Sequence, residues 1–211
     1  MSKKVIIIGS GNAGLTSGIA ALEKGAEVLI LEKGRKELAG GNTKYTAGAM
    51  RFTYSSKEDL LPLINDPFDE RISKTDFGSY TKEKFSSDLR DFNDGQNLTP
   101  EQKILVDNSF STMCWLASHN IKFEPIYNRQ SFKRNGNYVF WGGLTLASKN
   151  EGVGLFDQEL KVFLDLGGKI KYNTTTTELI LENDRVIGVS SGNNKFFADS
   201  IILACGGFEA S

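Results

Sequence analysis

The stretch that decides the fold reads Val5-Ile6-Ile7-Ile8-Gly9-Ser10-Gly11-Asn12-Ala13-Gly14. Its first four residues are apolar and β-branched, which is typical of a strand buried on both faces of a parallel sheet. Its last six fit the pattern G-x-G-x-x-G, which is weak alone and informative where it joins a strand to a helix. A helix is indicated here by Leu15, Ile19 and Leu22, which follow at helical spacing. The stretch therefore predicts a strand, a phosphate-binding turn and a helix.

The glycines of this turn have separate tasks in binding a dinucleotide. Gly9 permits the tight turn, Gly11 lets a pyrophosphate approach the backbone, and Gly14 lets the helix pack closely on the strand. The helix N-terminus presents unpaired N–H groups and a partial positive charge to the phosphates. Asn12 and Ala13 therefore join the predicted site.

A second strand is expected at Glu27–Leu31, parallel to the first, and Glu32 closes it 18 residues beyond Gly14. A carboxylate at this point can accept both hydroxyl hydrogens of an adenosine ribose. It would repel a 2′-phosphate, which disfavours NADP, although Lys33 and Arg35 weaken that exclusion. The alternative interpretation is a unit whose glycines serve packing and whose Glu32 is merely solvated. The joint presence of strand, turn, helix and acid favours the dinucleotide site.

Composition sets outer limits on function. The 211 residues include 25 basic and 26 acidic side chains, so no charge imbalance points to nucleic acid or an anionic membrane. Cys114 and Cys205 are too few for a disulfide framework, and we interpret both as buried packing residues. With one histidine, His119, a metal site is not expected. The apolar run Val5–Ile8 is too short for an export signal, so we expect a cytoplasmic protein without a membrane segment.

The middle of the chain predicts helices and a hairpin. Residues 34–56 are expected to form an ordered Gly-rich loop, and 57–98 a mixture of short helices and surface loop. A helix is expected from Thr99, which forms a capping box with Gln102. Its predicted core stripe is Val106, Phe110, Met113 and Ala117. A β-hairpin is expected to join Asn137–Trp141 to Leu144–Ala147 through Gly142-Gly143.

The last sixty residues predict a helix followed by strands. Phe156, Leu160 and Phe163 mark the helix. The expected strands, of which the three middle ones form an antiparallel meander, are Lys169–Asn173, Thr177–Leu181, Arg185–Ser190, Lys195–Ala198 and Ser200–Cys205. Turns are expected at Asn183-Asp184 and Asn193-Asn194. The predicted fold class is therefore α/β: a Rossmann-like parallel sheet flanked by helices, with an antiparallel β-meander.

The segment Gly40-Gly41-Asn42-Thr43-Lys44-Tyr45-Thr46-Ala47-Gly48-Ala49-Met50-Arg51 distinguishes between dinucleotides. Here the chain resembles the flavoprotein subunits of fumarate reductase and succinate dehydrogenase and their soluble relatives. The resemblance implies that this loop wraps the flavin and pyrophosphate of FAD. Membrane-bound members attach FAD through a histidine whose position is taken here by Asn42, so the implied FAD is non-covalent. A Gly-rich linker without a ligand is the alternative.

The resemblance continues through Trp115-Leu116-Ala117, through 151–155 and from Thr174 to Phe208. It implies that Thr176 contacts the adenine and that Ala204, Cys205 and Gly206 complete the nucleotide site. Within the family, residues 140–146 are most similar to tricarballylate dehydrogenases. The predicted cofactor-binding residues are Gly9, Gly11, Asn12, Ala13, Gly14, Glu32, Lys33, Gly40, Gly41, Asn42, Thr43, Thr46, Ala47, Gly48, Thr176, Ala204, Cys205 and Gly206.

The family's cap domain and catalytic arginine lie beyond the point that corresponds to Ser211. We therefore expect the N-terminal portion of an FAD-binding domain, and we predict no catalytic residue. Its expected parts are the dinucleotide unit 1–33, the flavin loop 34–56, a helical and hairpin region 57–150, and a closing region 151–208.

Three functions remain open at this point. The first is an FAD-dependent oxidoreductase that transfers hydride between flavin N5 and a C–C bond of a di- or tricarboxylate such as tricarballylate. The others are a non-catalytic FAD-binding module and an NAD-dependent Rossmann dehydrogenase. The expected partners of the full-length form are a small carboxylate substrate and an electron-acceptor protein.

Overall fold

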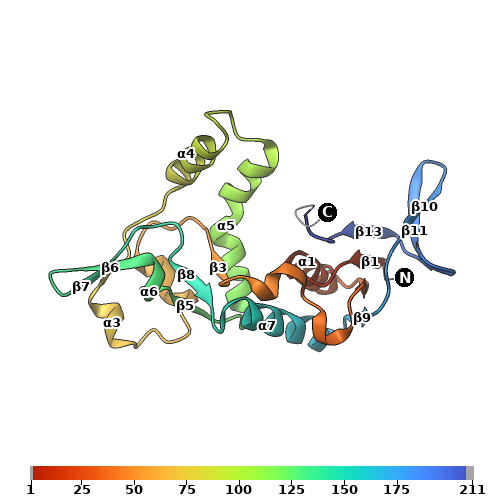
Figure 1. The fold of residues 1–211 in the computed structure, drawn as a ribbon, viewed down its shortest axis with the longest axis horizontal. Coiled ribbons are helices and arrows are strands. Elements are labelled where there is room, and N and C mark those ends of the chain that lie inside the picture. Colours follow the sequence, from red (N-terminus) through yellow and green to blue (C-terminus); the bar gives the residue numbers. More distant parts are fainter. Residues whose placement is uncertain (1, 208–211) are drawn as a thin grey trace. The chain divides into compact units, whose positions relative to one another are not determined.

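The computed structural model describes residues 2–207, and their contacts divide the chain into two units. One unit joins the residues up to Thr46 with those from Gly152 onward, and the other is Ala47–Glu151. The first unit therefore contains both the red and the blue parts of the chain in Figure 1. Phe208, which belongs to the last matched segment of the predicted family resemblance, lies outside the described residues.

The first unit is built on a four-stranded parallel sheet in the order β13-β1-β2-β9. These strands are β1 (Lys4–Ile8), β2 (Glu27–Leu31), β9 (Lys169–Lys171) and β13 (Ser200–Leu203). The register places Ile7 beside Ile30 on one side and Ile202 on the other, and Ile7 and Ile30 are fully buried. The predicted strand–helix–strand unit is confirmed, as is the fold class.

Two helices accompany this sheet, α1 (Asn12–Glu23) and α7 (Glu151–Asp165). α1 connects β1 to β2, as its spacing of apolar residues predicts. Phe163 of α7 packs against α1 where a glycine leaves room, because a Cβ on Gly18 would lie 2.6 Å from its ring.

The predicted meander is confirmed as β10 (Glu178–Glu182), β11 (Arg185–Ser191) and β12 (Asn194–Phe197), all antiparallel. Asn183 and Asp184 both have positive φ, as a tight type I′ turn requires. The second turn lies one residue earlier than predicted, at 192–193, because Gly192 accepts a positive φ. Val189 of β11 packs with Ile6 and Leu31, which attaches the meander to the parallel sheet.

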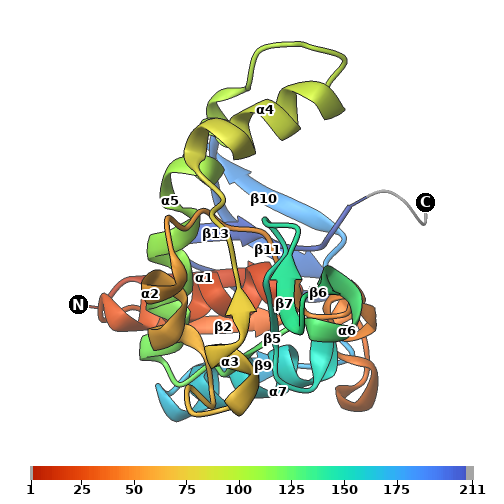
Figure 2. The ribbon, with the colours of Figure 1, turned by 90° about the vertical axis from the view of Figure 1, so that its left-hand side faces the viewer.

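The second unit contains two small sheets, and Figure 2 labels strands of both. One sheet has the order β3 (Ala49–Met50), β8 (Leu146–Ser148), β5 (Phe123–Pro125). The other has the order β4 (Thr75–Asp76), β7 (Asn137–Phe140), β6 (Ser131–Arg134). Its α-helices are α2 (Lys57–Leu60), α3 (Glu70–Ser73), α4 (Lys82–Phe92), α5 (Pro100–Ser118) and α6 (Tyr127–Gln130). The chain also forms 3₁₀ turns at η1 (Lys36–Leu38), η2 (Gly41–Tyr45) and η3 (Leu61–Leu63).

The predicted hairpin around Gly142-Gly143 is wrong. β7 pairs with β6 through Asn135-Gly136, whose φ values of +52° and +83° give a type I′ turn, whereas β8 pairs with β3 and β5. Gly143 has another task, since a Cβ there would lie 2.5 Å from a guanidinium nitrogen of Arg51. Asn-Gly is the strongest short hairpin signal, and it outweighs the Gly-Gly pair seven residues later.

The start of α5 is confirmed, because Thr99 and Gln102 form the reciprocal capping box. Its predicted stripe is only half right. Val106 and Met113 are buried, but Ser109 and Leu116 complete the buried set in place of Phe110 and Ala117.

Cys114, on the same helix, is exposed and not a core residue as expected. Nearby, the Ser109 hydroxyl accepts a hydrogen bond from the Thr53 amide, which explains a polar residue at a buried position.

Between residues 2 and 207 no helix has the length and apolar character needed to cross a membrane.

Candidate nucleotide site

The Gly-rich turn is held by two contacts that admit only glycine. Gly9 has a φ of +101°, and a Cβ there would lie 2.4 Å from the Ala204 carbonyl oxygen. A Cβ on Gly14 would lie 2.0 Å from the Gly9 carbonyl oxygen. These glycines let the end of β1, the start of α1 and the residue after β13 meet at one point. Gly11 differs, because a Cβ there would only reach ordinary contact, 3.4 Å from the Thr43 hydroxyl.

The predicted flavin loop lies against the start of α1. The Asn12 amide donates a 2.9 Å hydrogen bond to the Thr43 hydroxyl, so Thr43 takes part in capping the helix. Thr46 donates its hydroxyl to the Thr43 carbonyl and accepts from the Gly152 amide. A Cβ on Gly152 would lie 2.0 Å from the Thr43 carbonyl oxygen, which shows how closely α7 approaches this loop.

Glu32 occupies the end of β2, as predicted, but its carboxylate has partners within the protein. One carboxylate oxygen accepts from the Ser10 amide at 2.9 Å and the Ser10 hydroxyl at 2.6 Å. The other accepts from the Gly34 amide at 2.7 Å. Glu32 is buried, with 8% exposure, so the interpretation as a solvated side chain is wrong. A carboxylate offers about four acceptor positions, which leaves one for a ligand hydroxyl.

Ser10 is the residue that sequence reasoning missed. It is fully buried and joins the Gly-rich turn to the acid at the end of the second strand. Its place as the first variable residue of the G-x-G-x-x-G pattern was the available signal, because a hydroxyl there can reach that acid. The backbone of Glu32 adds to the same junction, donating to Lys171 and accepting from Thr174. Burial raises the pKa of the neighbouring Tyr172, and the charge of Glu32 raises it further.

Two predicted contact residues carry unused polar groups. The side-chain oxygen of Asn12 and the hydroxyl of Thr176 are buried and have no hydrogen-bond partner among residues 2–207. Buried polar groups are nearly always paired, so orphans of this kind are consistent with a ligand that supplies the partner. Together with the room beside Gly11, they fit an ADP-containing cofactor.

The remaining predicted residues are placed less uniformly. Ala204 donates its amide to the Ile8 carbonyl, which brings it beside the turn. Cys205 is exposed, not buried as expected, because it follows β13 at the open edge of the described sheet. Exposed positions are also taken by Ala13, Lys33, Gly41, Asn42, Thr46 and Gly206. Gly40, by contrast, is buried. Ala47 and Gly48 belong to the second unit.

The second unit holds a cavity of about 760 Å³ of its own. The two arginines of its lining are engaged: Arg71 bonds Asp69 and stacks on Tyr127 at 4.4 Å, and Arg129 pairs with Glu151 at 2.9 Å. The bond to Arg71 lowers the pKa of Asp69. Since each guanidinium already has a carboxylate partner, these arginines do not form a ready anion site.

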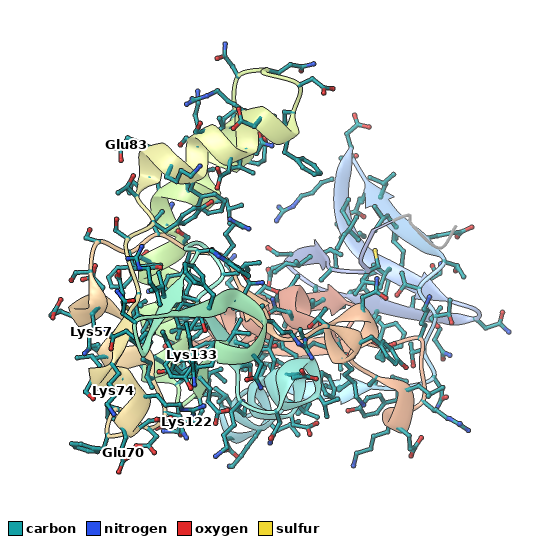
Figure 3. All side chains as sticks on the ribbon, turned by 60° about the vertical axis from the view of Figure 1, so that its left-hand side comes forward. Lys57, Glu70, Lys74, Glu83, Lys122 and Lys133 are labelled. Carbon is teal, nitrogen blue, oxygen red and sulfur yellow. The ribbon has the colours of Figure 1, made fainter. Side chains whose placement is uncertain are left out.

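Charged side chains of the second unit are otherwise spread over its surface. In Figure 3, Glu83 on α4 lies apart from the other labelled residues, which are Lys57, Glu70, Lys74, Lys122 and Lys133.

Comparisons with known proteins add to this geometry. The sequence profile of one family, described as FAD binding domain, matches residues 4–211. A fumarate reductase (cytochrome) of Shewanella frigidimarina is 25% identical over an alignment that covers 97% of this chain and 33% of that protein. An NADH:fumarate oxidoreductase of Klebsiella pneumoniae is 27% identical, over 100% of this chain and 21% of its own length. A urocanate reductase of Eggerthella lenta is 26% identical, over 98% and 32% respectively.

Solved structures agree on the fold. The open conformation of a flavocytochrome c3 fumarate reductase superposes with a TM-score of 0.69 at 22% identity, covering 98% of this chain and 34% of that one. A 3-ketosteroid delta1-dehydrogenase of Sterolibacterium denitrificans gives a TM-score of 0.68 at 13% identity, covering 98% and 48%. The chain thus spans about a third or less of the length of these curated relatives.

Proposed function

Since the chain belongs to the FAD binding domain family, we propose that it holds FAD for an oxidoreductase that acts on a carbon–carbon bond next to a carboxylate. The observation that carries this proposal is the junction of Gly-rich turn, helix start and buried acid in the first unit. The contacts of Gly9 and Gly14 leave no room for side chains, and Asn12 and Thr176 carry buried polar groups without a partner among residues 2–207.

Each part of this junction has a proposed task. The amides at the start of α1 and the open space at Gly11 would receive the pyrophosphate. The free acceptor position of Glu32 would bind a ribose hydroxyl, and Thr176 would contact the adenine. The residues from Gly40 to Gly48 would line the flavin. When bound, FAD supplies the capacity to accept or donate a hydride.

The substrate class rests on the relatives. Two of them are named for fumarate and one for urocanate. Both compounds carry a C=C bond conjugated to a carboxylate, which a hydride can reduce. We propose substrates of this kind, and we keep tricarballylate, the saturated tricarboxylate that sequence resemblance favours, as the finer candidate. An electron-acceptor or donor protein and a cytoplasmic location remain sequence-based proposals.

The test begins with the cofactor. Purified protein, stripped of ligand and titrated with FAD and separately with NAD, should bind FAD and show flavin absorbance, with no saturable response to NAD. Reduced-dye assays with fumarate and urocanate, and oxidised-dye assays with tricarballylate, should then identify the substrate. Absence of FAD binding would refute the proposal, whereas binding without turnover would identify an FAD-holding module.

A further inference from the structure

Glu159 is the most unusual titratable residue of the first unit. It lies in the middle of α7, its exposed fraction is 0%, and neither carboxylate oxygen has a hydrogen-bond partner among residues 2–207. A leucine of similar size would bury apolar surface at this position. An unpaired buried carboxyl group instead costs free energy, even when it is neutral.

The surroundings of Glu159 connect it to the cofactor site. α7 presents Gly152, Phe156, Glu159 and Phe163 at steps of four, three and four, which is one helix face, and all four are buried. The first two contact the predicted flavin loop: Gly152 approaches the Thr43 carbonyl, and the Phe156 ring fills the space above Gly40. Phe163, at the other end, packs against α1. Glu159 therefore lies on this buried face of α7, between Phe156, which meets the loop, and Phe163, which meets α1.

Few charges face this contact. Between Asn12 and Leu22, α1 carries no titratable side chain. From the loop, the Lys44 ammonium lies 5.0 Å from the Phe156 ring centroid and donates to the Glu37 carbonyl. The carboxylate of Glu32 is taken by Ser10 and Gly34. The other charged residues of α7, which are Glu151, Asp157, Lys161 and Asp165, are exposed.

Burial alone then governs the ionisation of Glu159, and it raises the pKa of this side chain to about 8. The folded value exceeds the value of about 4.5 in an exposed chain. Stability from the neutral group is therefore complete below pH 4.5 and is lost progressively as pH rises toward 8.

We propose that Glu159 is a proton-linked switch of cofactor binding. While its carboxyl group is neutral, α7 stays packed against residues 40–46. Ionisation of this group displaces the loop and weakens FAD binding. The anion cannot remain in an apolar contact without a partner, so α7 must shift or admit water. Either response moves Gly152 and Phe156, on which the loop rests. This inference rests on the proposed FAD site.

Two measurements on the 211-residue chain test the switch, each from pH 5 to pH 9. The first is the Kd for FAD, which should rise about tenfold between pH 7 and pH 9, because only the protonated form binds well. The second is the urea midpoint of the ligand-free protein, which should fall toward pH 8 and then level off. Glu159→Gln and Glu159→Leu should remove both pH dependences, and the leucine variant guards against a glutamine that fails to fold. Asp157→Asn, an exposed carboxylate on the same helix, is the matched control and should behave as the unaltered chain.

The outcomes separate the two proposals. Equal pH dependence in all four proteins would overturn the switch, as would a flat response of the unaltered chain. If no variant binds FAD at pH 7, the cofactor proposal fails, and the urea midpoints alone then decide whether Glu159 controls the seating of α7.

Discussion

Gly11 and Gly14 stand three residues apart in one motif, yet the structure gives them opposite requirements. Gly14→Ala should destabilise the protein by about 3 kcal/mol, because its Cβ would lie 2.0 Å from a carbonyl oxygen. Gly11→Ala should leave stability within about 0.5 kcal/mol, since its φ of −76° suits alanine and its nearest neighbour is at 3.4 Å. It should nevertheless weaken FAD binding at least about tenfold by filling the space of the pyrophosphate. Urea unfolding and FAD titration measure the two effects, and a Gly11→Ala protein with unchanged affinity would contradict this assignment.

Ser10 and Ser2 both donate a hydroxyl to a glutamate at 2.6 Å, but only Ser10 is buried. Ser10→Ala should cost about 1–3 kcal/mol and weaken FAD binding about tenfold, because the Glu32 carboxylate loses a partner and its orientation. Ser2→Ala is the matched control, and its effect should stay within about 0.5 kcal/mol. Similar losses from the two variants in urea unfolding would show that the buried bond has no special role.

The Asn135-Gly136 turn fixes the register of β6 and β7. Gly136→Ala should cost about 1 kcal/mol, because alanine is strained at a φ of +83°. Proton NMR of the unaltered chain should show cross-strand contacts between Phe132 and Val139, which are register partners. Contacts joining residues 141 and 144 as hairpin neighbours would instead restore the rejected topology.

Elements with a strong local signal were predictable from the sequence. The β-branched run of β1 and the capping box of α5 each state a structure within a few residues, and both are confirmed. The pairing of β8 with β3 has no local signal, because it joins residues nearly a hundred positions apart. The burial of Ser109 in place of Phe110 likewise depends on the amide of Thr53, which lies in another segment.

The candidate site was predictable in its glycines and its acid, and less so in their partners. The pattern of Gly9, Gly11 and Gly14 requires a particular turn chemistry, which the structure shows. The partners of Glu32 were missed, because the sequence pattern of a carboxylate at the end of a strand is the same whether that carboxylate is free to bind a ribose or already accepts from Ser10. The exposure of Cys205 was missed because burial depends on what covers a strand edge.

The second unit is an insertion into the sequence of the first. A chain in which a short Gly-Ser linker joins Thr46 to Gly152 should fold as the first unit alone, because these residues already share a 3.0 Å backbone hydrogen bond. It should keep cooperative urea unfolding and measurable, weakened FAD binding, since Ala47 and Gly48 would be absent. Loss of cooperative unfolding in this variant, while a linker of the same length inserted at the exposed Gly192 of the full chain is tolerated, would contradict modular folding.

The hydrogen bond between Thr46 and Gly152 also bears on how such a protein can change over time. The two residues that flank a segment of more than a hundred residues are joined by one backbone hydrogen bond. The segment can therefore lengthen, shorten or be replaced with little change in the geometry of the first unit. Variation in sequence and length can thus accumulate in the inserted segment while the parallel sheet and its Gly-rich turn keep their shape.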